Sequence, residues 1–396
     1  MLGSHEPLLT IDVERDVTVL PMIQGDSPDR QRGGALLKNQ ELIASRQLRA
    51  RREQSNTATA CSEWQLSQRE EPVQLQGTWL LGGFLHHHFG HFLSESIPRL
   101  WPLLSSDPPK IEGVLFIGTE GDVSTLNPSQ LGLIQYFFPK GSTHTQICTN
   151  PLLVEELLMP SQASTLGPLS EPTDTYLALL EKKQPQRLDN QTTQKLYVSR
   201  SRMNSSSRLI GERLIETVLE RAGFEIFHPQ DHSIDEQLSA YIGANKLVCC
   251  EGSAIHGLEL LGRVEADCLV ISRGGLRSKR LRSMSSVLRK RCRSFSVFSE
   301  ITRHPAIETL SNALGKPVPA HWNSGVWINY QALVKLLERI GIQSNLMPTR
   351  VQYQQAMKVE MLDYLLSLNT SGFGDSPART ARAFQILINK LKEDLA

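Results

Sequence analysis

KLYVSR (195–200) opens the stretch of sequence that decides the fold, and three further apolar segments follow it: EIFHP (225–229), KLVCCEG (246–252) and DCLVISRG (267–274). Short, continuous apolar runs of this kind predict strands that are buried on both faces. The segments between them predict helices, at 208–224, 233–244 and 253–262. Because buried strands alternate with helices, we expect a doubly wound α/β domain whose parallel sheet has about four strands.

Two helix boundaries in this stretch carry local signals. Gly223 stands just before a predicted strand, where a glycine commonly ends a helix. Ser233 and Glu236 have the spacing of a capping box, which marks the start of the next helix. Both signals agree with the alternation of strands and helices.

A similar alternation precedes this domain. Strands are expected at 17–22, 78–84, 112–118 and 152–160, and helices at 88–104 and 129–138. The stretch 29–54 is polar and almost free of apolar residues at helical spacing, so we expect a solvated helix or a loop there. After residue 273 the periodicity is helical, at 330–343, 353–368 and 377–395, with no strand signal of comparable strength.

Length and composition limit the class of protein. The 396 residues exceed what one core usually serves, so two domains are expected. With 40% apolar and 21% charged residues, the chain as a whole is neither disordered nor collagen-like nor a coiled coil. The 42 basic and 41 acidic side chains give a formal net charge of +1, so any electrostatic function must be local.

The cysteines and the chain start suggest a compartment. None of the six cysteines forms a CxxC pair, and Cys249, Cys250 and Cys268 lie in predicted buried strands, so we expect a reducing environment. Residues 1–10 lack the pattern of a secretory leader, and no apolar run has the length of a membrane span. The expected location is cytoplasmic, with the option of a peripheral position on the inner face of a membrane.

Polar residues follow the predicted strands at their carboxyl ends, where open parallel sheets bind ligands. They are Ser199 with Arg200 and Arg202, then His228, then Glu251 with Gly252 and Ser253, then Ser272 with Arg273. A Gly-Ser pair that opens a helix suits a phosphate, and Arg200, Arg202 and Arg208 would add charge for a diphosphate. In the alternative, these arginines are surface residues that pair with carboxylates such as Glu212. Neither GxGxxG nor a Walker A sequence is present, which argues against a nicotinamide dehydrogenase and a P-loop kinase.

A histidine cluster, HHHFGHFLSE (86–95), precedes the domain. On a helix, His88, His91 and Glu95 share one face, and His87 and His91 are four residues apart. Three interpretations stay open: a metal site, for which HExxH and a second histidine-rich segment are missing; imidazoles that bind helix-terminal backbone; and an acid/base pair of His91 and Glu95.

These segments together resemble glycosyltransferase family 61. The resemblance rests on FGHFLSESIPRLW (89–101), YVSRSRMNSSSRLIGERL (197–214), GFEIFHP (223–229) and SIDEQLSAYIGANKLVCCEGSAIHGLELL (233–261), and it covers about 75–275. It implies a GT-B architecture, in which two Rossmann-like domains face a cleft and the C-terminal one holds the nucleotide-sugar. It also implies an inverting transfer without a resident metal or other cofactor, and this chain shows no DxD sequence between apolar strand residues.

The resemblance assigns roles to residues that match the family pattern. His91 and Glu95 match its His and acidic pair, with His91 favoured as the base over Glu95. Ser199, Arg200, Arg208 and Glu212 match its donor-binding strand end and helix, with Gly211 in place of the usual Asn. The turn Glu251, Gly252, Ser253 and Ala254 matches a family turn that begins with His, so the role of Glu251 is open and His256, one helical turn away, could replace that His. Arg273 is a further candidate for the donor phosphates.

The expected organisation has three parts: an acceptor-side Rossmann-like domain (1–185), a nucleotide-sugar-binding Rossmann-like domain (186–300) and a helical extension (301–396). The expected partners are a nucleotide-sugar, most simply a UDP-sugar, and a saccharide or glycolipid acceptor in surface or capsular polysaccharide synthesis. The alternatives are a non-catalytic nucleotide- or sugar-binding protein on the same fold, and a metal-dependent hydrolase that uses His86–His91.

The segment 273–293 has nine basic and no acidic residues. Three interpretations stay open: a solvated face, a basic amphipathic helix on an anionic membrane, and donor-phosphate contacts by Arg273 and Arg277. Nucleic acid is not expected, because the segment lacks interleaved aromatic residues and no nucleic-acid-binding module is visible.

Overall fold

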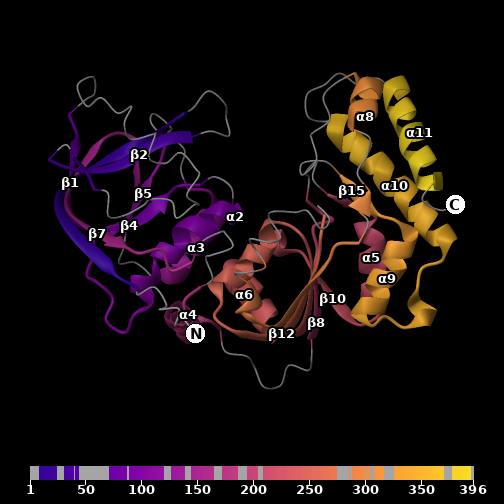
Figure 1. Ribbon diagram of the computed structural model, residues 1–396, viewed down its shortest axis with the longest axis horizontal. Helices are drawn as coiled ribbons and strands as arrows, with labels where there is room; N and C mark the ends of the chain where they lie inside the picture. The colour runs from indigo at the N-terminus through magenta and orange to yellow at the C-terminus, as the bar shows by residue number, and fades with distance from the viewer. Residues whose placement is uncertain are drawn as a thin grey trace, which may run out of the picture.

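The computed structural model describes residues 9–24, 31–39, 41–43, 71–86, 89–119, 126–138, 144–164, 172–185, 194–203, 208–273, 285, 288–300, 302–303, 307–315, 325–369 and 377–393. Within these ranges the strands form three sheets (Figure 1). The basic segment lies largely outside the described residues, as do His87 and His88, so the expectations for them stay predictions.

The first sheet has the order β3-β2-β1-β7-β4-β5-β6. Its strands are β1 (Ile11–Gln24), β2 (Gln31–Lys38), β3 (Glu41–Leu42), β4 (Val73–Phe84), β5 (Gly113–Ile117), β6 (His144–Cys148) and β7 (Leu152–Pro160). The four strands β7, β4, β5 and β6 are parallel, whereas β1, β2 and β3 add an antiparallel edge. The expectation of a helix or loop throughout 29–54 is wrong at β2, because Ala35, Leu36 and Leu37 are buried in the sheet.

The second sheet is parallel throughout and has the order β10-β8-β11-β12-β13. Its strands are β8 (Gln194–Val198), β10 (Phe224–Phe227), β11 (Ala244–Cys250), β12 (Val264–Ile271) and β13 (Cys292–Phe298). The four predicted strands are confirmed, and the doubly wound domain has a fifth strand, at its edge. Because the chain reverses its direction of growth after β10, the topological switch point lies between β8 and β11.

Alternate side chains of this sheet enter two different cores. Leu196 and Val198 of β8 join a cluster with α3 (Pro128–Phe137), α6 (Ile234–Gly243) and the 3₁₀ helix η6 (Ser253–Leu260). Tyr197 points to the opposite face, where it packs in a cluster with α5 (Glu212–Arg221) and the C-terminal helices. The sheet is therefore covered on both faces, as its continuous apolar strands predicted.

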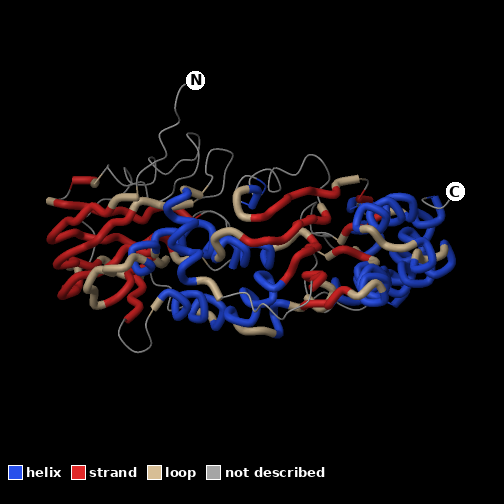
Figure 2. Tube along the Cα trace, turned by 90° about the horizontal axis from the view of Figure 1, so that it is seen from below, coloured by secondary structure: helices blue, strands red, loops and turns tan. Residues whose placement is uncertain are grey.

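The C-terminal region forms part of this second core. It contains α8 (Ile307–Leu314), α9 (Tyr330–Ile340), α10 (Arg350–Asn369) and α11 (Pro377–Glu393), which gather at one end of the molecule (Figure 2). The helices predicted at 330–343, 353–368 and 377–395 are confirmed. Strands also follow residue 273, where the sequence shows no strong strand signal: β13 lies there, and the expected helical extension contains β14 (Thr302–Arg303) and β15 (Val326–Ile328).

A third, small sheet joins β14, β15 and β9 (Leu209–Ile210). The helix predicted at 208–224 therefore begins only at Glu212. Gly211 separates strand from helix with φ +92°, a left-handed conformation that glycine adopts without strain. This small sheet thus connects the start of α5 to the C-terminal region.

One hydrophobic cluster connects the two large sheets. It contains Leu80 and Val114 of the first sheet, Leu247 and Cys268 of the second, and Phe92 from the segment after β4. The segment after β4 and the helix η6, which both contain candidate site residues, contribute side chains to this shared core. Cys148 and Cys292 are buried without disulfides, as are the three cysteines predicted to be buried. Among the described residues, no helix is both long enough and apolar enough to span a bilayer.

Candidate active site

The histidine-containing segment after β4 is a chain of short helical pieces, so the single helix predicted at 88–104 is wrong. The pieces are α2 (Phe89–His91), the π-helix η2 (Phe92–Ser96) and the 3₁₀ helices η3 (Ile97–Arg99) and η4 (Trp101–Leu104). Pro98 and Pro102 cause the interruptions, because proline has no N–H to donate to the preceding turn. A π-turn at this place is notable because such turns concentrate at functional sites.

His91 and Glu95 form a close pair. His91 Nδ1 lies 2.6 Å from Glu95 Oε1, and His86 Nε2 lies 3.5 Å from Glu95 Oε2. The Glu95 side chain is 7% exposed, whereas that of His91 is 32% exposed. A buried carboxylate thus holds the Nδ1 side of an imidazole whose ring still reaches solvent, which is the arrangement of an oriented general base. Among the described residues, no group of three His, Cys, Asp or Glu side chains is arranged to hold a metal.

Ser94, between His91 and Glu95 in sequence, connects this segment to η6. Its Oγ lies 3.0 Å from His256 Nδ1 and donates to Glu259 Oε1 at 3.1 Å. His256 Nδ1 is also 2.5 Å from Glu259 Oε1. His256 therefore lies within a buried hydrogen-bond network between η2 and η6. Sequence reasoning missed Ser94 and Glu259, because they lie more than 160 residues apart in the chain and meet only in the fold.

Glu212 anchors the carboxyl end of β8. Its Oε1 accepts hydrogen bonds from Tyr197 Oη at 3.0 Å, Ser199 Oγ at 3.3 Å and the backbone N–H of Arg200 at 2.9 Å. Complete burial raises the pKa of Glu212 to about 7. The structure thus brings Ser199, Arg200 and Glu212 together, with Glu212 behind the strand end.

Glu216 was not predicted, although it lies on the same face of α5 one turn later. Its Oε1 accepts the hydroxyls of Ser199 and of Ser201. The (i, i+4) spacing of the two glutamates is the signal that could have identified it. Two carboxylates therefore hold the turn that leads out of β8.

Arg200 and the turn after β11 are in close contact. A Cβ on Gly252 would lie 2.0 Å from Arg200 Nη1, so only glycine leaves room for this guanidinium. Gly252 has an extended backbone and immediately precedes Ser253 and Ala254, the first residues of η6. Burial lowers the pKa of Arg200, and the positive charge of Arg273 lowers it further. Arg200 thus lies against Gly252, and Arg273 Nε donates to the carbonyl of the preceding residue, Glu251, so both guanidinium groups lie on the turn before η6.

Glu251 places Arg273. Its carboxylate Oε2 accepts the backbone N–H of Arg273 at 2.7 Å and Ser272 Oγ at 3.2 Å, and its carbonyl accepts Arg273 Nε at 2.8 Å. The residue that departs from the family pattern therefore joins the carboxyl ends of β11 and β12. All of these residues lie at the carboxyl edge of the sheet, at or next to its switch point.

Arg208 lies in a different environment. It directly precedes β9, and its Cζ lies 6.0 Å from the centre of the Tyr364 ring on α10. Burial lowers its pKa, and the positive charge of Arg213 also lowers it, whereas the carboxylates of Asp363 and Glu360 raise it. The structure therefore groups Arg200 with Arg273, and Arg208 with α10.

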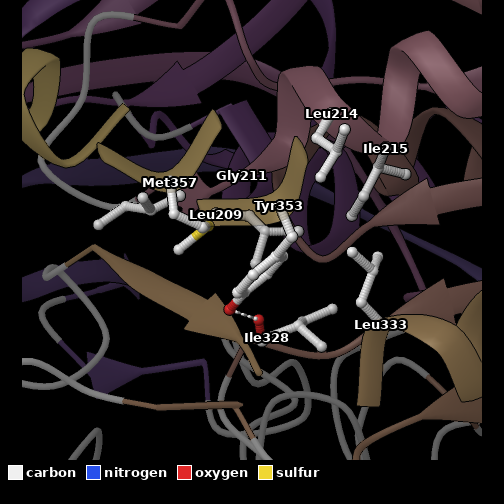
Figure 3. A pocket seen from close by; sticks show the side chains of 9 residues that line it. Leu209, Gly211, Leu214, Ile215, Ile328, Leu333, Tyr353 and Met357 are labelled. Carbon is white, nitrogen blue, oxygen red and sulfur yellow. Dashed lines mark hydrogen bonds between the residues drawn. The ribbon is translucent and has the colours of Figure 1, made fainter. Parts of the chain in front are cut away.

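A small cavity lies behind the start of α5 (Figure 3). It is lined by apolar side chains from β9, α5, β15, α9 and α10, and Tyr353 Oη closes one side by donating to the carbonyl of Ile328 at 2.8 Å. Its volume of about 10 Å³ is at the lower limit for one water molecule. The cavity is a packing defect of the second core and has no room for a sugar nucleotide.

The part of the chain that matches a known family contains most of the candidate site. No curated protein matches the chain. Residues 89–261 match the model of the family described as Glycosyltransferase 61, and this range runs from the start of α2 to the end of η6. It contains both the His91–Glu95 pair and the Arg200–Gly252 contact. The match over this part of the chain supports an assignment to glycosyltransferase family 61, a family of glycosyltransferases.

Proposed function

We propose that the chain transfers a sugar from a nucleotide-sugar, most simply a UDP-sugar, to a hydroxyl of a saccharide or glycolipid acceptor, with inversion at the anomeric carbon and without a resident metal. The two large sheets would be the two halves of a GT-B enzyme, divided near residue 186, and 301–396 would belong with the donor half. The observation that carries the proposal is that Arg200 and Arg273 both lie on the turn Glu251–Gly252, just before η6 and at the switch point of a parallel sheet.

The donor diphosphate would bind between these two arginines. Guanidinium groups form charge-assisted, bidentate hydrogen bonds with phosphate oxygens. The amide of Gly252 and the first amides of η6, at Ser253 and Ala254, would add the partial positive charge of a helix start. Both sources of charge would stabilise the diphosphate as it leaves, when its negative charge increases.

His91 would act as the base. Its Nε2, the ring nitrogen that does not contact Glu95, would take the proton of the acceptor hydroxyl. Glu95, hydrogen-bonded at Nδ1, would orient the ring and stabilise the imidazolium that forms. The acceptor oxygen forms a bond to the anomeric carbon, and the bond from that carbon to the diphosphate oxygen breaks. The nucleoside diphosphate leaves with the electron pair of that bond, so charge and protons balance.

The proposal is tested by measuring nucleoside diphosphate release from a panel of nucleotide-sugars, with saccharide acceptors, in the presence and absence of EDTA. We expect turnover with one sugar nucleotide that EDTA does not reduce. His91→Ala should abolish transfer and leave binding of the nucleoside diphosphate intact. Binding without turnover for every donor would favour the non-catalytic alternative, and loss of activity in EDTA would favour a metal-dependent enzyme.

The proposal includes a cellular location for the enzyme. We place the enzyme in the cytoplasm because Cys249, Cys250 and Cys268 are buried and form no disulfides, with 273–293 as a contact to anionic lipid when the acceptor is a glycolipid. Co-sedimentation with liposomes that contain or lack acidic lipid tests this contact, and equal binding to both would remove it.

A further inference from the structure

Helix α5 starts without a cap of its own. Its N-cap residue is Gly211, which has no side chain to accept a hydrogen bond from the first turn. The first amides of a helix have no partner within the helix, and a buried amide needs an acceptor. Gly211 is buried, so the acceptor has to come from another element.

Glu360 on α10 supplies that acceptor. Its Oε2 accepts the N–H of Gly211 at 2.9 Å, and its Oε1 accepts the N–H of Arg213 at 3.2 Å. Met357, one turn earlier on α10, lies so close that a Cβ on Gly211 would be 2.6 Å from its Sδ. Glu360 is 6% exposed. A carboxylate from the C-terminal region thus caps α5 with both of its oxygens.

The capped turn holds Arg200. Glu212 stands between the two capped amides, and its Oε1 accepts the backbone N–H of Arg200. Displacement of this turn would move Glu212 and, with it, the backbone that carries the Arg200 guanidinium against Gly252. A chain of contacts therefore runs from α10 through α5 to the proposed diphosphate site.

The cap also decides where phosphate can bind. In many doubly wound nucleotide-binding domains a phosphate lies at the start of the helix that follows the first strand. Here that position is the start of α5, and an internal carboxylate occupies it. A phosphate there would meet the charges of Glu360 and Glu212 in place of free amides, which leaves the start of η6 as the favourable end.

We propose that Glu360 is a positioning residue of the donor site, which fixes the first turn of α5 so that Glu212 holds Arg200 at the donor diphosphate. This inference rests on the proposed function for the identity of the ligand. It gives the C-terminal helices a role in donor binding, for which the sequence offered only helical periodicity.

The charged groups around Glu360 suggest a matched control. On α5 these are Glu212 and Arg213, before β9 there is Arg208, and on α10 there is Asp363. Asp363 Oδ2 accepts Arg213 Nη2 at 2.5 Å on the surface. Asp363→Asn therefore removes a charged contact between the same two helices without touching the amides of α5.

The test compares Glu360→Gln and Glu360→Ala with Asp363→Asn and the wild type. The first measurement is the Kd for UDP by calorimetry. We expect the Kd to rise about fivefold in Glu360→Gln, which cannot accept both amides, and further in Glu360→Ala, while Asp363→Asn stays within about twofold. The second measurement is hydrogen exchange of a peptide over 197–203, with a peptide over 264–271 as internal reference.

Exchange separates positioning from general loss of stability. We expect Glu360→Gln to speed exchange over 197–203 more than over 264–271, whereas partial unfolding of the domain would speed both alike. Equal acceleration of both peptides, or a Glu360→Gln variant with unchanged UDP affinity and unchanged exchange, would overturn the inference. Should wild-type protein bind no UDP or other nucleoside diphosphate, the proposed function fails, and the exchange comparison still decides whether Glu360 positions Arg200.

Discussion

Ser94 Oγ and His256 Nδ1 lie 3.0 Å apart, which joins the segment that carries His91 and Glu95 to the helix η6, which begins at Ser253. Glu259 accepts the Ser94 hydroxyl and contacts His256, so all three polar groups are satisfied within a buried network. Such a network fixes the distance between the proposed base on one segment and the proposed phosphate site on the other. In a transferase this distance decides whether the acceptor oxygen reaches the anomeric carbon.

Ser94→Ala should therefore lower turnover more than donor binding. The variant removes the hydroxyl that bridges η2 and η6, and a lost buried hydrogen bond costs about 1 kcal/mol, which corresponds to roughly a fivefold loss of kcat if the base is misplaced. Steady-state kinetics with saturating donor measures the effect. Ser105→Ala is the control, because Ser105 Oγ donates to the carbonyl of Pro102 within its own turn, next to η4. An unchanged kcat in Ser94→Ala would contradict the bridging role.

Gly252→Ala should weaken donor binding. The new Cβ would lie 2.0 Å from Arg200 Nη1, so the guanidinium has to leave its position beside the start of η6. The Kd for UDP should rise by about tenfold or more, because a displaced arginine loses charge-assisted hydrogen bonds to phosphate. Gly132→Ala on α3 is a suitable control, since its Cβ would make only an ordinary 3.4 Å contact with Ile234. Equal UDP affinity in both variants would remove Arg200 from the donor site.

Stability should fall as the pH rises from about 5 to 8. Burial raises the pKa values of Glu212 and Glu360 to about 7 in the folded protein, whereas the ordinary value is 4.5. A carboxyl group with a raised pKa binds its proton more tightly in the folded state, so its stabilisation is complete below pH 4.5 and is lost as the pH rises through 7. For one such group the change is about 3 kcal/mol at most, and the two groups are coupled, so their effects do not add.

Urea unfolding of the wild type and Glu212→Gln across this pH range measures the effect. The neutral amide cannot ionise, so the variant should show a flatter dependence of the free energy of unfolding on pH. Glu225→Gln, at an exposed position on β10, should leave the dependence unchanged. A wild-type stability that rises between pH 5 and 8 would contradict the raised pKa values.

The sequence predicted the parallel sheet because its central strands are buried on both faces and so are continuously apolar. It failed at β2 and β13, whose polar residues interrupt the apolar run: CRSFSVF has exposed or half-buried residues from Arg293 to Val297. β13 is the edge strand of its sheet and has few buried side chains, and β2 has an apolar run of only three residues, Ala35–Leu37, so both patterns are weak. The helix predicted across Gly211 had the right periodicity, but β15 pairs with Leu209 and Ile210 from more than a hundred residues away.

The residues of the candidate site were likewise predictable from the sequence only in part. Residues at strand ends, such as Arg200, Glu251 and Arg273, were found because parallel strands all end at one edge of the sheet. Arg208 was grouped with them from its place in the sequence, and the structure puts it against Tyr364. Glu360 could not be found, because its role depends on a hydrogen bond to Gly211 across 149 residues.

We therefore expect Arg273→Ala to weaken UDP binding and Arg208→Ala to lower the stability of the fold. Glu251 holds Arg273 beside the proposed diphosphate site, so the loss of Arg273 should raise the Kd for UDP by about tenfold and leave the melting temperature unchanged. Arg208 packs on Tyr364 of α10, so its loss should lower the melting temperature by a few degrees, about 1 kcal/mol, and leave the Kd for UDP within about twofold. Calorimetric titration and thermal unfolding of both variants separate the two effects. If Arg208→Ala lost donor affinity at unchanged stability, the donor site would extend to β9 and the assignment by strand ends would be incomplete.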